Sequence, residues 1–189
     1  MSNQALVPGS IADKALKTKT SIAEIFLHLD VVVLIDVSAS MSCKDASGGR
    51  ERYEVATEEL ARLQRENPGK VAVVAFSDKV LFCPAGIPVF MKSGTNLHLA
   101  LDFIKPADDC GIKLWVISDG EPNDETSCIS RAKLFKTKID TIYIGPEDGP
   151  GRAFLRRLAA ATGGISTVQK TQDLNQLSST MKKLLSSGR

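Results

Sequence analysis

The sequence predicts an α/β fold: a doubly wound, mostly parallel sheet with one antiparallel edge strand and helices on both faces. Three observations lead to this expectation. Short apolar runs rich in β-branched residues recur along the chain, helical patterns lie between them, and one run follows its predecessor almost at once. Strands buried on both faces read as continuous apolar runs, and parallel neighbours need a crossover, usually a helix, between them.

The expected strands are the apolar runs themselves. Four of them, at residues 31–35, 71–76, 113–117 and 139–144, are short enough to be strands buried on both faces. A fifth run, residues 80–83, begins only three residues after the second one ends. So short a connection cannot hold a crossover, so this run is expected to be an antiparallel hairpin partner.

The expected helices lie between these runs and after the last one, where apolar residues recur at helical spacing. Gly163 and Gly164 are expected to end the fourth of the five helices. The five periodic sets are Tyr53, Ala56, Leu60 and Leu63; Leu97, Leu101 and Ile104; Ile129, Ala132 and Phe135; Phe154, Leu155, Leu158 and Ala159; and Leu174, Leu177, Met181 and Leu184.

We divide the 189 residues into an N-terminal arm, residues 1–29, and one α/β domain, residues 30–189. A domain of this size buries enough surface for one core without disulfides. In the arm, Ile22, Ile25, Phe26 and Leu29 predict a short amphipathic helix, whereas residues 1–20 read as polar and loose. The arm is assigned no function.

Composition excludes several classes of protein. The longest apolar run is far shorter than the roughly 20 residues of a membrane-spanning helix, and the N-terminus lacks the features of a secretory signal, so we expect a cytoplasmic protein without a membrane span. The net charge of +2 indicates no nucleic-acid footprint. The four cysteines are widely spaced, which favours reduced thiols over a zinc site. By contrast, residues 106–128 carry six acids and one base, an imbalance that favours a cation.

Polar side chains gather where ligands bind in an open α/β sheet, at the carboxyl ends of the strands. Asp36, Ser38 and Ser40 directly follow the first run, and Asp119 follows the third of the four central runs. Thr95 lies just before a predicted helix. Hydroxyl and carboxylate oxygens without sulfur or imidazole suit Mg²⁺, Mn²⁺ or Ca²⁺. With only two carboxylates the ion would be under-neutralised, and it would retain waters or recruit a carboxylate from outside.

These residues carry a resemblance to a known family. The sequence Asp-Val-Ser-Ala-Ser-Met at residues 36–41, then Thr95, then Asp-Gly at 119–120 resembles the metal-ion-dependent adhesion site of von Willebrand factor A (vWA) domains. The resemblance covers residue 30 to the C-terminus and implies a Rossmann-like vWA fold. Residues 117–124 are similar to bacterial, intracellular members, which often work beside AAA+ ATPases or within multiprotein complexes. One departure is the loop at residues 43–50, which is longer and more polar than is usual for the family.

The resemblance also implies roles for the five site residues. Ser38 and Ser40 would bind the metal directly, Thr95 directly or through water, and Asp36 and Asp119 mainly through waters. The sixth coordination position is typically left for an Asp or Glu of a partner protein.

Each of these residues also has an ordinary interpretation, because Asp, Ser and Thr commonly cap helices and turns. Only their conjunction favours a metal site. Glu121 and Asp124 are more simply solvated loop acids, and His98 a surface histidine.

Two functions remain after this comparison. The favoured one is a non-enzymatic, metal-dependent protein-interaction module. The alternative is a Mg²⁺-dependent phosphatase of the haloacid-dehalogenase type, which also places an Asp after its first strand. Such enzymes need a second carboxylate two positions later, and that position is Ser38, which cannot act as the acid.

Overall fold

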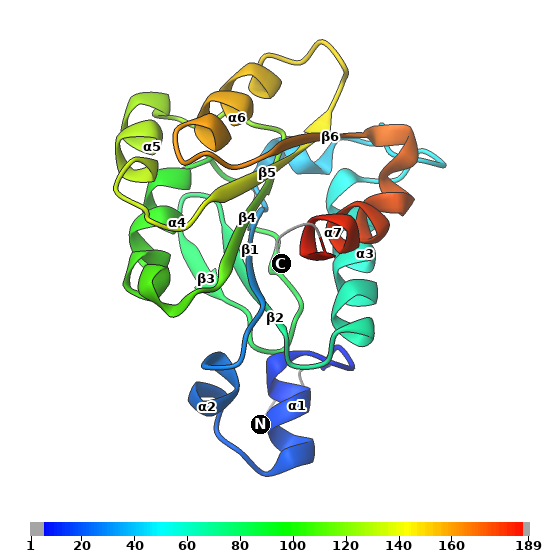
Figure 1. The fold of residues 1–189 in the computed structure, drawn as a ribbon. Helices are drawn as coiled ribbons and strands as arrows, with labels where there is room; N and C mark the ends of the chain where they lie inside the picture. Colours follow the sequence, from blue (N-terminus) through cyan, green and yellow to red (C-terminus); the bar gives the residue numbers. More distant parts are fainter. Residues whose placement is uncertain (1–5, 187–189) are drawn as a thin grey trace.

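Six strands form one sheet in the computed structural model, which describes residues 6–186 (Figure 1). The sheet order is β3-β2-β1-β4-β5-β6. Only β3 runs antiparallel, against β2, and the other neighbouring pairs are parallel. The predicted fold class is therefore confirmed. The strands are β1 (Val31–Asp36), β2 (Val71–Phe76), β3 (Val80–Phe82), β4 (Lys113–Ser118), β5 (Ile139–Gly145) and β6 (Ser166–Lys170).

Helices cover both faces of the sheet (Figure 1). One face carries α3 (Arg52–Glu66) and α7 (Leu177–Ser186). The other carries α4 (Leu97–Ile104), α5 (Glu125–Ala132) and α6 (Gly151–Ala160). Short 3₁₀ segments, η1 (Ala39–Ser42), η2 (Lys105–Cys110) and η3 (Thr171–Gln176), complete the connections.

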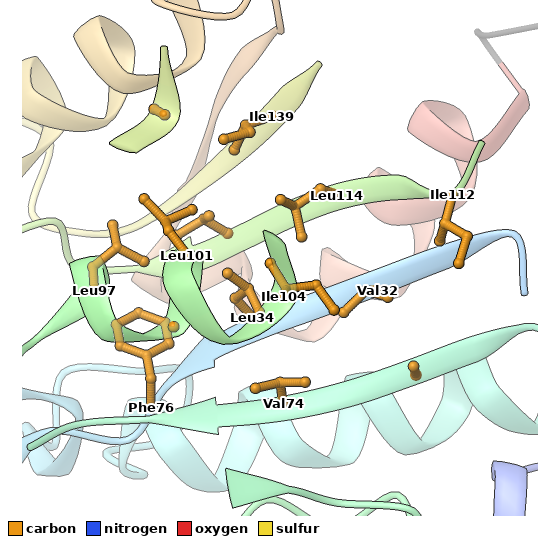
Figure 2. Close-up of a cluster of buried hydrophobic side chains, with 14 of the residues drawn as sticks. Val32, Leu34, Val74, Phe76, Leu97, Leu101, Ile104, Ile112, Leu114 and Ile139 are labelled. Atoms are coloured by element: carbon orange, nitrogen blue, oxygen red, sulfur yellow. The ribbon is translucent and has the colours of Figure 1, made fainter. Parts of the chain in front are cut away.

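The core has two halves because successive side chains of a strand point to opposite faces of the sheet. Every residue of β1 is buried. Val32 and Leu34 of β1 pack with Leu101 of α4 on one side, as Figure 2 shows. Val33 belongs to the other cluster, which includes Leu60 of α3. This two-sided burial is the reason that the central strands read as unbroken apolar runs.

The order of the strands along the sheet reverses beside β1. From β1 the chain passes through α3 to β2, which is the neighbour of β1 on one side, whereas β4 is its neighbour on the other side. Ile35 and Ile117 pair directly, so the carboxyl ends of β1 and β4 lie side by side. Such a reversal of strand order is where α/β sheets bind their ligands.

Two elements were not predicted from the sequence. The edge strand β6 is mostly half-exposed, with Gln169 as its one buried residue, so it lacks an apolar run. In the arm, α1 (Ile11–Thr18) begins where the Ser10 side chain accepts a hydrogen bond from the Asp13 N–H. The expectation of a loose segment is wrong for residues 11–18, because Ile11 and Ala15 are buried against the core. The predicted arm helix is α2 (Ile22–Phe26).

Within residues 6–186, no helix combines the length and the apolar character needed to cross a membrane.

Candidate metal centre

Three segments meet at the carboxyl end of the sheet, and hydrogen bonds join them. They are residues 36–40 after β1, residues 93–96 before α4, and residues 118–123 after β4. The Ala39 N–H donates to the Ser93 carbonyl at 3.1 Å, and the Asn123 N–H donates to the Thr95 carbonyl at 2.9 Å. The five residues predicted as metal ligands therefore lie on segments that the fold brings together.

Asp36 is the most deeply buried of the predicted ligands and has no exposed surface. Its Oδ1 accepts from the Ser38 N–H at 2.8 Å, and its Oδ2 accepts from the Ser118 hydroxyl at 2.6 Å. The pKa of Asp36 is raised to about 6, chiefly by burial and also by the negative charge of Asp119, against the hydrogen bonds from Ser118 and Ser38, which lower it. Asp36 is therefore a carboxylate whose negative charge is poorly compensated.

The two serines of the first segment present a pair of hydroxyls. Their Oγ atoms lie 3.1 Å apart and share a hydrogen bond, with Ser38 buried and Ser40 exposed. Ser38 occupies the N-cap position of η1, yet its side chain makes no capping hydrogen bond. The same is true of Asn96 at the start of α4, which Thr95 precedes. The capping interpretation therefore does not explain Ser38, and at α4 the N-cap position belongs to Asn96 and not to Thr95.

Asp119 has an oxygen without a partner. The residue is 5% exposed, and its Oδ1 is buried with no hydrogen bond from any described residue. A buried polar atom normally has a partner, so an unpaired carboxylate oxygen indicates a place for a cation or an ordered water. Its other oxygen, Oδ2, lies 3.4 Å from Nη1 of Arg52.

Thr95 is held between the segments and is 6% exposed. Its N–H donates to Oδ1 of Asn123 at 3.4 Å, and Asn123 also donates from Nδ2 to the Asn96 side chain at 2.9 Å. The position of Thr95 is thus tied to the segment that carries Asp119.

Sequence reasoning missed four side chains that build this site. Ser118 binds Asp36, and the Ser77 hydroxyl hydrogen-bonds Ser93 at 2.6 Å. Both directly follow or end a buried strand, the same signal that identified Asp36 and Asp119. The other two, Asp45 and Arg52, form an ion pair beside Asp119 that no local spacing reveals.

The loop at residues 43–50 supplies Asp45 and is itself anchored. Ala46 is buried and forms an isolated β-bridge with Arg50. Arg50 makes two hydrogen bonds to the Glu58 carboxylate, at 2.7 and 2.9 Å. This loop, which is longer and more polar than is usual in vWA domains, thus fixes the Asp45 carboxylate near the site.

The donor set fits a small, hard cation. The candidate ligands offer oxygen atoms alone, and one of these oxygens, Oδ1 of Asp119, lacks a partner. Among residues 6–186, no three His, Cys, Asp or Glu side chains come together in a way that could hold a metal. A cation at this site would therefore depend on the serine and threonine hydroxyls and on water, as Mg²⁺ commonly does.

The remaining candidates have other surroundings. Asp124 caps α5 by accepting from the Ser127 N–H at 2.9 Å, and Glu121 is exposed. His98 differs from the expected surface histidine, because it is half-buried and its Nδ1 has no hydrogen-bond partner among the described residues.

Comparison with known proteins gives matches in structure alone. No protein-family model and no curated protein sequence matches the chain. BatB, a conserved hypothetical protein from Bacteroides thetaiotaomicron, superposes with a TM-score of 0.62 at 19% identity, covering 84% of this chain and 100% of BatB. A von Willebrand factor type A protein from Catenulispora acidiphila gives 0.52 at 20% identity, covering 83% of this chain and 42% of its own.

A third match is a mutant of the PilB minor pilin from Streptococcus sanguinis, with a TM-score of 0.54 and 14% identity. It covers 82% of this chain, which spans 60% of the pilin's length. Identities this low establish architecture and leave ligands open. The chain has a vWA-like α/β fold.

Proposed function

We propose that this protein is a metal-dependent protein-interaction module. A divalent cation, Mg²⁺ or alternatively Mn²⁺ or Ca²⁺, binds at Asp36, Ser38, Ser40, Thr95 and Asp119. An Asp or Glu of a partner protein then completes the coordination. The observation that carries this proposal is the unpaired, buried Oδ1 of Asp119 beside a second buried carboxylate and a pair of hydroxyls.

The electrostatics of the site support the cation. Asp36 and Asp119 are close enough that the charge of Asp119 raises the pKa of Asp36. Two buried like charges repel each other, and a divalent cation between or beside them would remove that repulsion. The hydroxyls of Ser38 and Ser40 add oxygen ligands without adding negative charge. A cation held in this way keeps a net affinity for an incoming carboxylate.

The phosphatase alternative has less support from the geometry. A carboxylate nucleophile must reach a phosphorus atom, whereas Asp36 has no exposed surface and both its oxygens accept hydrogen bonds. Ser38 stands where an acid would be needed to protonate the leaving group. The interaction module is therefore the better-supported function.

The setting of the module rests on the sequence resemblance. We propose a partner within a multiprotein complex or beside an AAA+ ATPase. A cytoplasmic location and the absence of nucleic-acid binding stay predictions.

Calorimetric titration of chelator-stripped protein with Mg²⁺, Mn²⁺ and Ca²⁺ tests the metal site. We expect saturable binding by the wild type and a loss of about tenfold or more in Ser40→Ala and Asp119→Asn, since each removes an oxygen ligand or a charge. Ser42→Ala is the matched control. It lies on the same η1 segment, and its hydroxyl donates to the Ala39 carbonyl.

Two results would contradict the metal site. One is a folded wild type that binds none of the three ions. The other is an unchanged affinity in both Ser40→Ala and Asp119→Asn.

A further inference from the structure

An ion pair between the buried Arg52 and the half-exposed Asp45 lies against the candidate metal site. Arg52 is the first residue of α3, and 8% of its side chain is exposed. Its Nε donates to Oδ1 of Asp45 at 2.8 Å and its Nη2 donates to Oδ2 at 2.6 Å. Its Nη1 reaches Oδ2 of Asp119 at 3.4 Å. One guanidinium thus contacts both a loop carboxylate and a candidate site carboxylate.

From this geometry we infer that Arg52 is the resident counter-charge of Asp119, and that Asp45 restrains it so that Asp119 stays available to a cation. The pair would then set the affinity of the site for divalent ions. This inference rests on the proposed function in its metal-binding part. Arg52 and Asp45 are positioning residues here, since neither is placed as a ligand.

The distances show which carboxylate holds the guanidinium. Two short, parallel hydrogen bonds to one carboxylate are the strong bidentate arrangement of arginine. The contact with Asp119 is single and lies at the outer limit of a hydrogen bond. Because Asp45 holds the Nε–Nη2 edge of the guanidinium, Arg52 does not close on Asp119, whose Oδ1 stays unpaired.

The charges around the site give the direction of each substitution. Asp36, Asp45 and Asp119 contribute three negative charges and Arg52 one positive charge, so the ionised cluster carries a net charge of −2. Losing Asp45 alone leaves the guanidinium free to bind Asp119 and reduces the net negative charge. Losing Arg52 alone removes a repulsive positive charge beside the incoming cation.

The anchoring of the loop explains why Asp45 can act in this way. The side chain of Asp45 is 37% exposed, and a mobile surface carboxylate would hold an arginine weakly. Here Cys43 and Ala46 fix the backbone on either side. The Arg52 N–H donates to the Cys43 carbonyl at 3.1 Å, and Ala46 is buried.

The test is a double-mutant cycle on Mg²⁺ affinity, measured by calorimetry on chelator-stripped protein. We expect Asp45→Asn to weaken binding by about tenfold and Arg52→Met to strengthen it by a similar factor. We expect Asp45→Asn/Arg52→Met to bind at least as well as the wild type. Arg131→Met is the matched control, because it removes the same charge from an arginine that pairs with Asp102, away from the loop at residues 43–50.

Whether adding Arg52→Met to Asp45→Asn restores the affinity for Mg²⁺ distinguishes a positioning role from an ion pair that only stabilises the fold. If the pair only stabilised the fold, removing Arg52 would also weaken binding, and the double variant would bind no better than Asp45→Asn. Either of those results overturns the inference. A gain in affinity in Arg131→Met as large as that in Arg52→Met would overturn it as well, because the effect would then come from the net charge of the protein.

A metal-free measurement separates this inference from the proposed function. In EDTA, we expect Arg52→Met to lower the melting temperature, and to lower it less in an Asp119→Asn background. If all the variants are folded and none binds Mg²⁺, the proposed function is wrong. The melting temperatures of Arg52→Met, Asp119→Asn and their combination then decide the inference alone. Coupling between Arg52 and Asp119 supports Arg52 as the counter-charge, and independent effects overturn it.

Discussion

Several residues at the carboxyl end of the sheet hold a buried charge or an unfavourable backbone conformation that an ordinary core does not contain. Asp36 and Asp119 are both buried, and one oxygen of Asp119 has no partner. Such an arrangement costs stability unless a ligand compensates for it, which is why strain and unpaired polar atoms gather at functional sites. Gly120, the residue after Asp119, has a φ of +78°, a backbone conformation that residues with a side chain rarely adopt.

Substitution of Gly120 by alanine should damage both the fold and the site. A Cβ on Gly120 would lie 2.3 Å from the carbonyl oxygen of Gly151, at the start of α6, and φ is positive. We expect the free energy of unfolding to fall by about 1–3 kcal/mol. The affinity for Mg²⁺ should also fall, because the backbone shift displaces Asp119. Chemical denaturation and calorimetry measure the two effects.

Gly163→Ala is the control for this prediction. Gly163 follows α6, has a φ of +74°, and has nothing within 4 Å of its Cβ position. It should cost about 1 kcal/mol from the backbone alone and leave Mg²⁺ affinity unchanged. Equal affinities in Gly120→Ala and the wild type would show that the turn does not position Asp119.

At the scale of elements, burial decides what the sequence reveals. Strands β1, β2, β4 and β5 could be predicted because burial on both faces leaves runs that are wholly or mostly apolar. The edge strand β6 could not, because Ser166, Thr167 and Lys170 read as loop residues. Two of the three predicted site segments follow one simple rule, polar residues after buried strands, and the third, which carries Thr95, was identified by its place before a helix. The contact of Arg52 with Asp119 spans 67 positions and depends on how α3 packs, so no sequence pattern predicts it.

Asp108 joins two elements and should govern stability in acid. Its buried carboxylate, in η2, accepts from Nζ of Lys105 at 2.6 Å, from the Lys136 N–H at 2.9 Å and from the Thr137 N–H at 2.9 Å. Burial alone would raise the pKa of Asp108, but these hydrogen bonds outweigh it and lower the pKa to about 2. The segment before β5 is thereby fixed to η2.

We predict that Asp108→Asn lowers the free energy of unfolding by about 1–3 kcal/mol at neutral pH. The pKa of Asp108 in the folded protein lies below the ordinary aspartate value of 3.8, so the carboxylate stabilises the fold above about pH 4, and this stabilisation is lost as the pH falls toward about 2. The stability of the variant should therefore depend less on pH in that window. Urea denaturation across the acid range measures both effects.

Asp109→Asn is the matched control for Asp108. Asp109 pairs with Lys136 at 2.7 Å, but the two side chains are 74% and 76% exposed, so the pair should contribute little. If Asp108→Asn and Asp109→Asn had the same effect, the buried hydrogen bonds of Asp108 would not be the source of its stabilising role.

At the scale of the whole molecule, the sheet topology gathers the site at one place. β1 lies between β2 and β4 and runs parallel to both, so the carboxyl ends of these three strands lie at the same end of the sheet (Figure 1). Residues 36–40, 93–96 and 118–123 meet there through the hydrogen bonds of Ala39, Asn123 and Ser118. A cation bound at this edge would hold all three segments together, and it would lie at the surface through exposed Ser40.

That position leads to the last prediction, which concerns the partner. If a carboxylate of another protein completes the coordination, binding must require both the cation and the serine hydroxyls. We expect immobilised wild-type protein to retain specific proteins in Mg²⁺ and to release them in EDTA. Ser40→Ala should retain none of them, and Ser42→Ala should retain all. A captured protein should then lose binding when one exposed Asp or Glu of its own is changed to Asn or Gln. Retention that survives EDTA or Ser40→Ala would place the interaction surface away from the carboxyl end of the sheet, because the cation would then play no part in the contact.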